Sequence, residues 1–255
     1  TVAGVFDLNL SVAPYYFGTT SLMMAFFALP PDTELWREKG YWQYADKEFN
    51  RFGLKMLAHP LGGTGEDIFH IMLREPVKPG PKPLTGRKVR GNIFYKPIIE
   101  PLGGSIVTLS GAEIYSAIQK GVVEGAAWPV LGAVNFKWYE VAKYMARPRF
   151  GSSPYTVTMN MGRFKKLSSA DQALLLKVGR DLEHETPKVF DKATAEEIAT
   201  LKTHGVKETF LDPKTAEKLA KGFKLGIWNL ARKNKTTTER AEILFNMAKA
   251  NGHTP

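Results

Sequence analysis

The chain has 255 residues, 44 % hydrophobic and 24 % charged, a composition typical of a globular protein with one or two domains. Cysteine is absent, which excludes disulfides, thiolate nucleophiles and cysteine-ligated zinc. The net charge of +10 favours anionic partners, but the short basic clusters at 163–166 and 232–235 accompany no nucleic-acid motif. No apolar run, including Ser21–Leu29, is long enough to cross a bilayer. We therefore expect no nucleic-acid binding and no membrane-embedded segment.

The N-terminal part predicts a strand followed by an aromatic loop. Apolar and polar residues alternate over Val5–Val12, which is typical of a strand. Tyr15, Tyr16 and Phe17 follow it and form either a pocket wall or the closing edge of a core. The Met- and Phe-rich run Ser21–Leu29 indicates buried helix or core lining.

The next stretch predicts a helix, two strands and a crossover. Glu34–Phe52 reads as one helical stretch, and Leu54–Ala58 and Ile68–Val77 read as strands. The glycine-rich turn Leu61–Asp67 lacks the spacing of a phosphate-binding loop, so we interpret it as a crossover between two domains. Three prolines in Val77–Pro83 predict an extended surface loop.

Three strands follow in a pattern that predicts a parallel α/β sheet. They are Arg87–Arg90, Ser105–Leu109 and Val122–Trp128, with helical segments between them. In such sheets ligands bind beyond the carboxyl ends of the strands. Arg90 and Trp128 both stand at such ends, so we expect a permanent cation and a large ring in one cleft.

The helices around these strands have clear end signals. One begins near Ile93, and another begins at the capping box formed by Ser110 and Glu113 and stops at Gly121. A further helix is predicted over Phe136–Met145, with its rings packing against the core.

The C-terminal third predicts a strand and long helices. Tyr155–Met161 reads as a strand, and a second capping box at Ser169 opens a helical pattern that continues to about Lys202. Pro187 lies inside this pattern and predicts either a bend in one long helix or a break between two. The remaining residues, 213–250, are helical and basic.

The motifs of residues 84–144 resemble the solute-binding protein of a tripartite ATP-independent periplasmic (TRAP) transporter, the DctP family. The order L-x-G-x-K-x-R, then E-x-Y-x-A-x-Q-x-G-V-V-E-G, then W-Y-E-V-A-K-Y carries the resemblance, which extends from about residue 4 to residue 221. The matching residues are Leu84, Gly86, Lys88, Arg90, Glu113, Tyr115, Ala117, Gln119, Gly121, Glu124, Gly125 and Trp138–Tyr144.

The resemblance implies an α/β, two-lobed periplasmic-binding-protein fold of type II with a long kinked interlobe helix. We assign residues 1–66 and 154–195 to lobe I, and residues 67–153 and 196–255 to lobe II. A family member would also carry a strand–helix–strand–helix unit before Thr1, so we expect that an N-terminal unit is missing from lobe I.

The resemblance also implies where a ligand carboxylate is held. The Arg of the matching K-x-R motif binds it in the family, and that position is Arg90 here. Trp128 stands where other members carry Asn or Trp and would supply an apolar wall. Asn92 either donates a second hydrogen bond to the ligand or caps the next helix.

One position departs from the family pattern. Members that bind sialic acid or dicarboxylates carry a second Arg where this chain has Phe69. This favours a monocarboxylate, such as a 2-oxo, hydroxy or aromatic acid. The neighbours Asp67 and His70 are further candidates, as are Tyr15 and Tyr16, although His70 fits a strand histidine equally well.

The resemblance implies a periplasmic protein that captures a small organic acid anion and passes it to a TRAP membrane permease. The alternatives are a two-lobed sensor domain for signalling, a C4-dicarboxylate binder of the same family, and a small-molecule enzyme. The five histidines lack metal-ligand spacing and no nucleophile-elbow motif is present, so we expect no catalysis, no metal and no cofactor.

Overall fold

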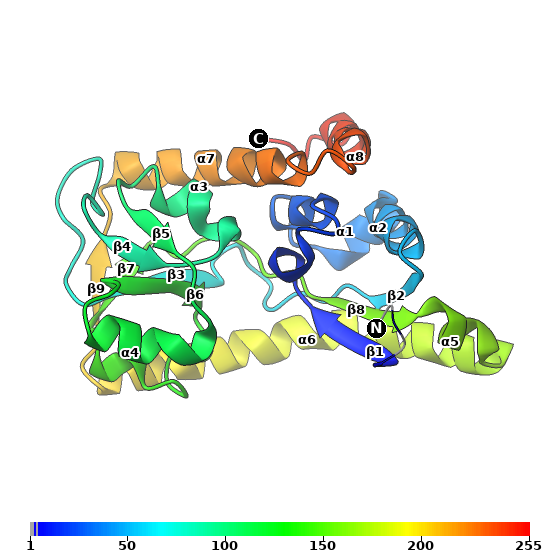
Figure 1. The fold of residues 1–255 in the computed structure, drawn as a ribbon, viewed down its shortest axis with the longest axis horizontal. Coiled ribbons are helices and arrows are strands. Elements are labelled where there is room, and N and C mark those ends of the chain that lie inside the picture. Colours follow the sequence, from blue (N-terminus) through cyan, green and yellow to red (C-terminus); the bar gives the residue numbers. More distant parts are fainter. Residues whose placement is uncertain (1–2, 4) are drawn as a thin grey trace. The chain divides into compact units, whose positions relative to one another are not determined.

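The computed structural model describes residue 3 and residues 5–255, which fall into two compact units. Unit 1 comprises Thr1–Thr64, Ser153–Phe190 and Trp228–Thr254, and unit 2 comprises Gly65–Ser152 and Asp191–Ile227, with Pro255. The sequence analysis assigned residues 196–255 to the second lobe, whereas the structure groups Trp228–Thr254 with unit 1. Figure 1 shows the elements of both units, coloured in sequence order.

Unit 1 is built around a three-stranded sheet. Its elements are β1 (Leu8–Ser11), η1 (Ala13–Tyr16), η2 (Leu22–Phe27), α1 (Thr33–Glu38), α2 (Tyr41–Asn50), β2 (Leu54–Ala58), β8 (Thr156–Asn160), α5 (Met161–Lys166), the first part of α6 (Ser169–Thr203), the end of α7 (Pro213–Ala231) and α8 (Thr238–Ala250).

Unit 2 is built around a six-stranded sheet. Its elements are β3 (Phe69–Leu73), β4 (Lys88–Arg90), η3 (Ile93–Tyr95), α3 (Lys96–Ile99), β5 (Ser105–Val107), η4 (Gly111–Glu113), α4 (Ile114–Gln119), β6 (Gly125–Pro129), η5 (Trp138–Glu140), β7 (Tyr144–Arg147), the last part of α6, β9 (Lys207–Phe210) and most of α7.

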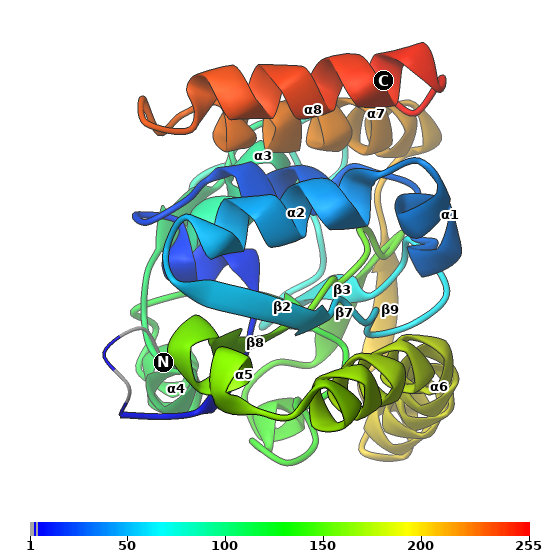
Figure 2. The ribbon, with the colours of Figure 1, turned by 90° about the vertical axis from the view of Figure 1, so that its right-hand side faces the viewer.

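The sheet of unit 1 has the order β1-β8-β2, and both pairings are antiparallel. Figure 2 shows α2 and α8 layered on one side of β2, and α5 with the start of α6 on the other. Alternation along β1 places Leu8 and Leu10 opposite Met159 and Val157 on one face of the sheet. Leu8 and Leu10 are 52 % and 63 % exposed, so α5 and α6 leave part of this face uncovered.

The sheet of unit 2 has the order β5-β4-β6-β3-β7-β9. Strands β5, β4 and β6 are mutually parallel, which confirms the parallel arrangement predicted for this segment. β3 is antiparallel to both β6 and β7, and β7 is parallel to β9. The sheet is therefore mixed, and Figure 1 shows α4 on one face with α3 and α7 on the other.

Both faces of the unit 2 sheet carry a dense core. On the face covered by α4, Met72 packs with Ile114, Trp138 and Met145. On the other face, Phe69 lies among the rings of three neighbours, with centroid distances of 4.8, 5.7 and 5.9 Å to Phe94, Tyr95 and Phe150. Sheets of this kind have near-continuous apolar strands because both faces are buried.

The long helix α6 runs without a break from Ser169 to Thr203 and contains Pro187, so the alternative of two separate helices is wrong. The bend predicted at Pro187 stays a prediction. The cap lies one residue earlier than predicted, since the Asp171 backbone N–H donates to Ser168 Oγ at 3.1 Å. Among residues 3 and 5–255, no helix is both long enough and apolar enough to cross a bilayer.

The predicted helical stretch Glu34–Phe52 is helical but interrupted, and the helix predicted over Phe136–Met145 is wrong. The stretch Glu34–Phe52 forms two helices, α1 and α2, because Gly40 adopts a φ of +77° between them. The predicted helix over Phe136–Met145 is a single turn, η5, followed by β7. Lys137 has a φ of +55°, which an α-helix does not accommodate. The sequence pattern resembled a helix because Trp138 and Met145, which are about two helical turns apart in the sequence, are both buried in the core beside the sheet.

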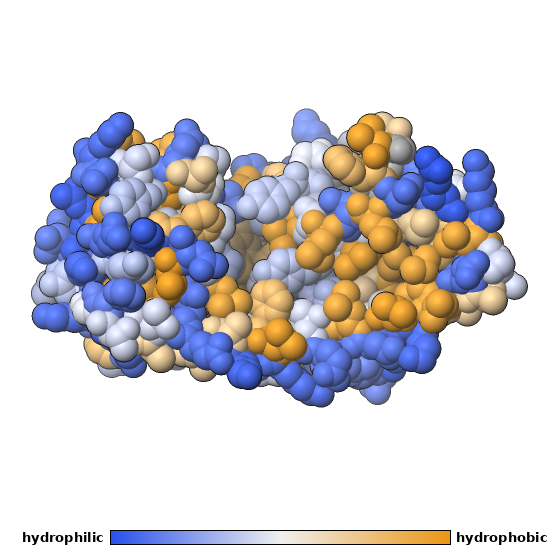
Figure 3. All heavy atoms as spheres, turned by 90° about the horizontal axis from the view of Figure 1, so that it is seen from below, coloured by the Kyte–Doolittle hydropathy of each residue, from blue (hydrophilic) through white to orange (hydrophobic). Residues whose placement is uncertain are grey.

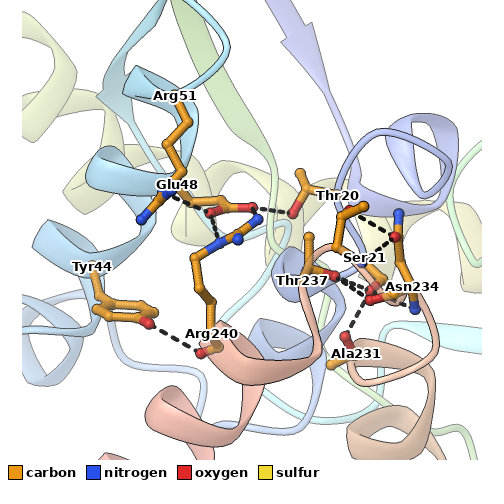
Figure 4. Close-up of polar contacts among 10 residues, drawn as sticks. Thr20, Ser21, Tyr44, Glu48, Arg51, Ala231, Asn234, Thr237 and Arg240 are labelled. Carbon is orange, nitrogen blue, oxygen red and sulfur yellow. Dashed lines mark hydrogen bonds and ion pairs between the residues drawn. The ribbon is translucent and has the colours of Figure 1, made fainter.

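A polar cluster explains why the C-terminal residues belong to unit 1. Glu48 of α2 is 2 % exposed and accepts hydrogen bonds from Arg240 Nε at 2.6 Å, Arg240 Nη2 at 3.0 Å and Thr20 Oγ1 at 2.7 Å. Ser21 Oγ donates to the Ala231 carbonyl at 2.6 Å (Figure 4). A buried carboxylate needs such partners, so this cluster fixes α8 and the end of α7 to unit 1.

Candidate functional site

Arg90 ends β4 and is 4 % exposed. Its Nε and Nη2 atoms both donate to the Leu109 carbonyl, at 2.9 and 2.8 Å. Because two N–H groups of the guanidinium donate to the same carbonyl oxygen, a rotation of the side chain would break both hydrogen bonds. The position and plane of this buried cation are therefore fixed by the backbone that follows β5.

Trp128 of β6 lies against this cation, with Arg90 Cζ 4.5 Å from the centroid of the indole ring. Two glycines lie close to the ring. A Cβ at Gly111 would lie 3.5 Å from Trp128 Cη2, and a Cβ at Gly132 would lie 3.4 Å from Trp128 Nε1. Gly132 also has a φ of +109°, which disfavours any other residue. The indole therefore lies in a slot beside these two glycines, and a Cβ at either position would make ordinary van der Waals contact with it.

Two more rings fix the indole in that slot. Trp138 contacts Trp128 edge to face at a centroid distance of 5.6 Å, and Phe136 does so at 6.3 Å. Phe136 also stacks on Trp138 at 5.4 Å and is 41 % exposed. The indole is therefore supported on one side by packed rings, and it lies beside the guanidinium of Arg90.

The strand order explains how residues far apart in the sequence come together. β5, β4 and β6 are adjacent and parallel, so their carboxyl ends lie at one edge of the sheet. Leu109, Arg90 and Trp128 follow or end these three strands. Ligands of open α/β sheets bind at this edge. The structure brings Arg90 and Trp128 together as predicted.

His70 pairs with Trp128 in the register of β3 and β6 and is fully buried. Burial, together with the charges of Arg147 and Arg149, lowers the pKa of His70 to about 3, so the ring is neutral at pH 7. Neither ring nitrogen has a hydrogen-bond partner among the residues that the structure describes. The structure therefore places His70 beside the indole as a buried neutral ring.

The other candidates of unit 2 lie elsewhere. Phe69 is 4 % exposed, and because it precedes His70 in β3 its ring points to the opposite face of the sheet, among the aromatic core. Asp67 forms an ion pair with Arg149. Asn92 Oδ1 accepts a hydrogen bond from the Phe94 N–H at 3.0 Å, so it caps η3.

Tyr15 and Tyr16 belong to unit 1, where they line a pocket of about 320 Å³. Tyr15 is 70 % exposed, whereas Tyr16 Oη lies 3.0 Å from Thr156 Oγ1. Burial raises the pKa of Tyr16, so this hydroxyl stays protonated. Hydroxyl, amide and apolar side chains line the rest of the pocket: Asn9, Ser11, Thr19, Thr20, Phe49, Phe52, Leu54, Thr156 and Thr158.

Two features of the site had no signal in the sequence analysis. The Leu109 carbonyl orients Arg90, but a backbone acceptor leaves no trace in a side-chain pattern. Phe136 was assigned to a helix, which hid its position beside Trp128. The described part of the chain contains no cluster of three His, Asp or Glu side chains that could hold a metal ion.

Comparisons with known proteins agree on one family. The sequence model of the family described as "Bacterial extracellular solute-binding protein, family 7" (DctP) matches residues 13–226. An uncharacterized protein of Haemophilus influenzae is 26 % identical over 65 % of this chain and 56 % of its own length. The 2,3-diketo-L-gulonate-binding periplasmic protein YiaO of Escherichia coli is 27 % identical over 60 % and 46 %. The chain thus spans about half the length of the curated relatives it matches.

Solved structures share the fold at low sequence identity. A TRAP periplasmic solute binding protein from Desulfovibrio salexigens, with bound orotic acid, has a TM-score of 0.84 and 19 % identity over 98 % of this chain and 82 % of that one. One from Rhodoferax ferrireducens, with bound malonate, has a TM-score of 0.80 and 19 % identity over 98 % and 81 %. These likenesses show the two-lobed fold.

Proposed function

Because the chain belongs to family 7 of the bacterial extracellular solute-binding proteins, we propose that it captures a small organic acid outside the cytoplasm and delivers it to a TRAP membrane permease. The observation that carries this proposal is the buried, oriented guanidinium of Arg90 at the carboxyl ends of three parallel strands. A guanidinium keeps its charge at any physiological pH and matches a carboxylate with two parallel hydrogen bonds.

The ligand that we propose is a monocarboxylate with a compact or planar body. Trp128 offers an apolar face beside the cation, and such a face favours a flat apolar group over a hydrated one. Phe69 provides no charge for a second carboxylate. The names of two matched proteins, which bind 2,3-diketo-L-gulonate and orotic acid, support an acid ligand, and the malonate-bound structure keeps the dicarboxylate alternative open.

Calorimetric titration of the protein with a panel of carboxylic acids, orotate and malonate included, tests the function. We expect one acid of the panel to bind, and Arg90→Ala to weaken it by at least about 1.5–3 kcal/mol, the contribution of a hydrogen bond to a charged group. Arg90→Lys keeps the charge but loses the planar fork, so it should restore only part of the affinity.

Arg87→Ala is the matched control, because Arg87 lies near the start of the same strand and donates to the Glu75 and Pro76 carbonyls at 3.0 and 2.7 Å. It should leave the dissociation constant unchanged. Arg90 is buried, so its removal also lowers the stability of the free protein, and affinity is therefore measured directly on folded variants. Undiminished binding by folded Arg90→Ala would remove Arg90 from the ligand site. Turnover of the bound acid would favour an enzyme instead.

A further inference from the structure

Unit 2 contains a groove outside the site at the strand ends. It has a volume of about 380 Å³ and lies between the loop 77–83, α3 and α7. Apolar and glycine residues form its walls together with a few polar ones: Gly80, Pro81, Pro97, Pro101, Leu102, Leu219 and Gly222, with Asp212, Lys214, Thr215 and Lys218.

The walls of the groove are stiff before anything binds. Proline fixes φ, so the backbone of Pro81, Pro97 and Pro101 has little freedom to lose on binding. The loop is also closed on itself, since the Lys78 N–H donates to the Pro83 carbonyl at 3.1 Å and Lys78 Nζ donates to the Thr85 carbonyl at 2.9 Å. A preformed groove of this kind suits a partner that inserts a side chain.

The four lysines of α7 differ in their partners. Lys221 Nζ lies 2.9 Å from Glu217 Oε1, and Lys224 Nζ lies 2.7 Å from Glu66 Oε1. Lys214 and Lys218, which line the groove, form no ion pair with any residue that the structure describes. They are one helical turn apart, and like charges at this spacing destabilise a helix. The two lysines of α7 without an ion-pair partner among the described residues are therefore the exposed ones that line the groove.

The one carboxylate in the groove forms no ion pair with Lys214 or Lys218, which leaves the groove with one net positive charge. Asp212 Oδ1 accepts the Thr215 N–H at 3.0 Å and caps the start of α7. Hydrogen bonds from Thr215 lower the pKa of Asp212, so this carboxylate stays ionised as a helix cap. The groove thus combines an apolar interior with two ammonium groups at its rim.

We infer that this groove is a docking site for an acidic segment of a protein partner, which inserts one aromatic side chain and places carboxylates against Lys214 and Lys218. Two ammonium groups one turn apart match two carboxylates on one short peptide, whereas a small monocarboxylate would satisfy only one of them. The inference does not depend on the proposed solute or on Arg90.

Labelled peptides test the site directly on the whole chain. We would measure fluorescence anisotropy with fluorescein-labelled EEWEE, with QQWQQ, which lacks the charges, and with EEAEE, which lacks the ring. We expect EEWEE to bind at low ionic strength and to weaken with added salt, because exposed charges are screened. Equal binding of QQWQQ or of EEAEE would overturn the inference, as would no binding of EEWEE at all.

Matched variants separate the groove from the general positive charge of the protein. Lys214→Glu combined with Lys218→Glu should weaken EEWEE about tenfold, since each exposed ion pair contributes a few-fold. Lys221→Glu, on the same helix but outside the groove, should change binding far less. An equal loss in Lys221→Glu would show that net charge alone attracts the peptide.

Gly222→Trp adds a large ring at the wall of the groove, and its Cβ meets open space, because no atom lies within 4 Å of a Cβ built at Gly222. It should fold, because a helical glycine is replaced by a better helix former, and it should abolish EEWEE binding while leaving the titration of the solute site unchanged. Retained EEWEE binding in Gly222→Trp would contradict the inference. Equally tight binding of free indole-3-acetate at the groove would identify a small-molecule site instead.

Discussion

The two sheets of the molecule are covered to different extents. In unit 2 both faces are buried, one under α4 and the other under α3 and α7, and strand β3 is buried at every position. In unit 1 the strand β1 is exposed or half-exposed along its length, and Leu8 and Leu10 face outward beside α6. Figure 3 shows a broad apolar area on this side of unit 1. Among residues 3 and 5–255, a buried cation, Arg90, is found only at a strand end of the covered sheet.

The different coverage of the two sheets explains why the side chains at the strand ends of unit 2 are held in fixed positions. A sheet packed on both faces holds its strand ends in place, so Arg90 and Trp128 are positioned by many neighbours. In unit 1 the buried charges have oppositely charged partners instead. Glu48 pairs with Arg240, and Glu183 accepts from Arg37 Nε at 2.7 Å and Trp42 Nε1 at 2.8 Å. Those carboxylates stabilise the packing of helices.

The largest effect is expected in the covered sheet. Phe69→Arg would place a charge among rings on a fully covered face, so we expect a loss of about 4 kcal/mol of unfolding free energy or more. Urea unfolding followed by circular dichroism measures it. Phe136→Arg, at a ring that is 41 % exposed, should cost only about 1 kcal/mol. A stable Phe69→Arg variant that binds malonate more tightly would contradict the orientation of Phe69 described here.

A smaller loss is expected at the polar cluster of unit 1. Arg240→Ala leaves the buried Glu48 carboxylate without its main cationic partner, which should cost about 3 kcal/mol in urea unfolding. Arg51→Ala is the control, because its side chain is 60 % exposed and lies 3.7 Å from Glu48 (Figure 4). It should cost less than about 1 kcal/mol. Equal effects would mean that burial does not govern this cluster.

Each unit also contains one buried histidine, and these give the chain a dependence on pH. Burial lowers the pKa of both His59 and His70 to about 3 in the folded state. In the unfolded chain the pKa is about 6.5, so the stability is fully present above that pH and falls as the pH drops toward 3. Each ring contributes a slope of about 1.4 kcal/mol per pH unit in this window.

His70→Phe removes one of these two titrations. We expect the dependence of the unfolding free energy on pH, measured in urea between pH 6 and 4, to become less steep by about 1.4 kcal/mol per pH unit. His59→Phe should do the same but should also lower stability at pH 7, because His59 Nδ1 lies 3.1 Å from Thr156 Oγ1. An unchanged slope in His70→Phe would show that this histidine is already charged in the folded protein.

Much of the fold could be predicted from local signals. The strand Leu54–Ala58 has the predicted bounds, because Gly53 and Pro60 flank a run that suits a strand. The Ser110–Glu113 capping box is present, with Glu113 Oε2 accepting from the Ser110 N–H at 2.9 Å. These features depend on residues a few positions apart, which is why the sequence alone predicts them.

Features that depend on strand register could not be predicted. The helix predicted over Phe136–Met145 runs into the start of β7, because the buried residues Trp138 and Met145 recur at a helical spacing. Strand β9 was missed because Lys207–Phe210 is mostly exposed and gives little apolar pattern. The side of the sheet to which Phe69 points depends on its pairing with Pro129 in β6. Arg90 was the site residue that the sequence predicted best, because the K-x-R motif places it at the end of a strand.

The smallest effect concerns the uncovered sheet face of unit 1. Leu8→Thr combined with Leu10→Thr introduces β-branched side chains, which suit a strand, and removes two exposed apolar ones, so the unfolding free energy should change by less than about 0.5 kcal/mol. Binding of the dye 1-anilinonaphthalene-8-sulfonate should fall, because such dyes report contiguous apolar surface. Leu225→Thr in α7, where the leucine is also 52 % exposed, should leave dye binding unchanged. If both variants bind the dye equally, exposure of single leucines explains the signal and the two sheets do not differ in the way proposed.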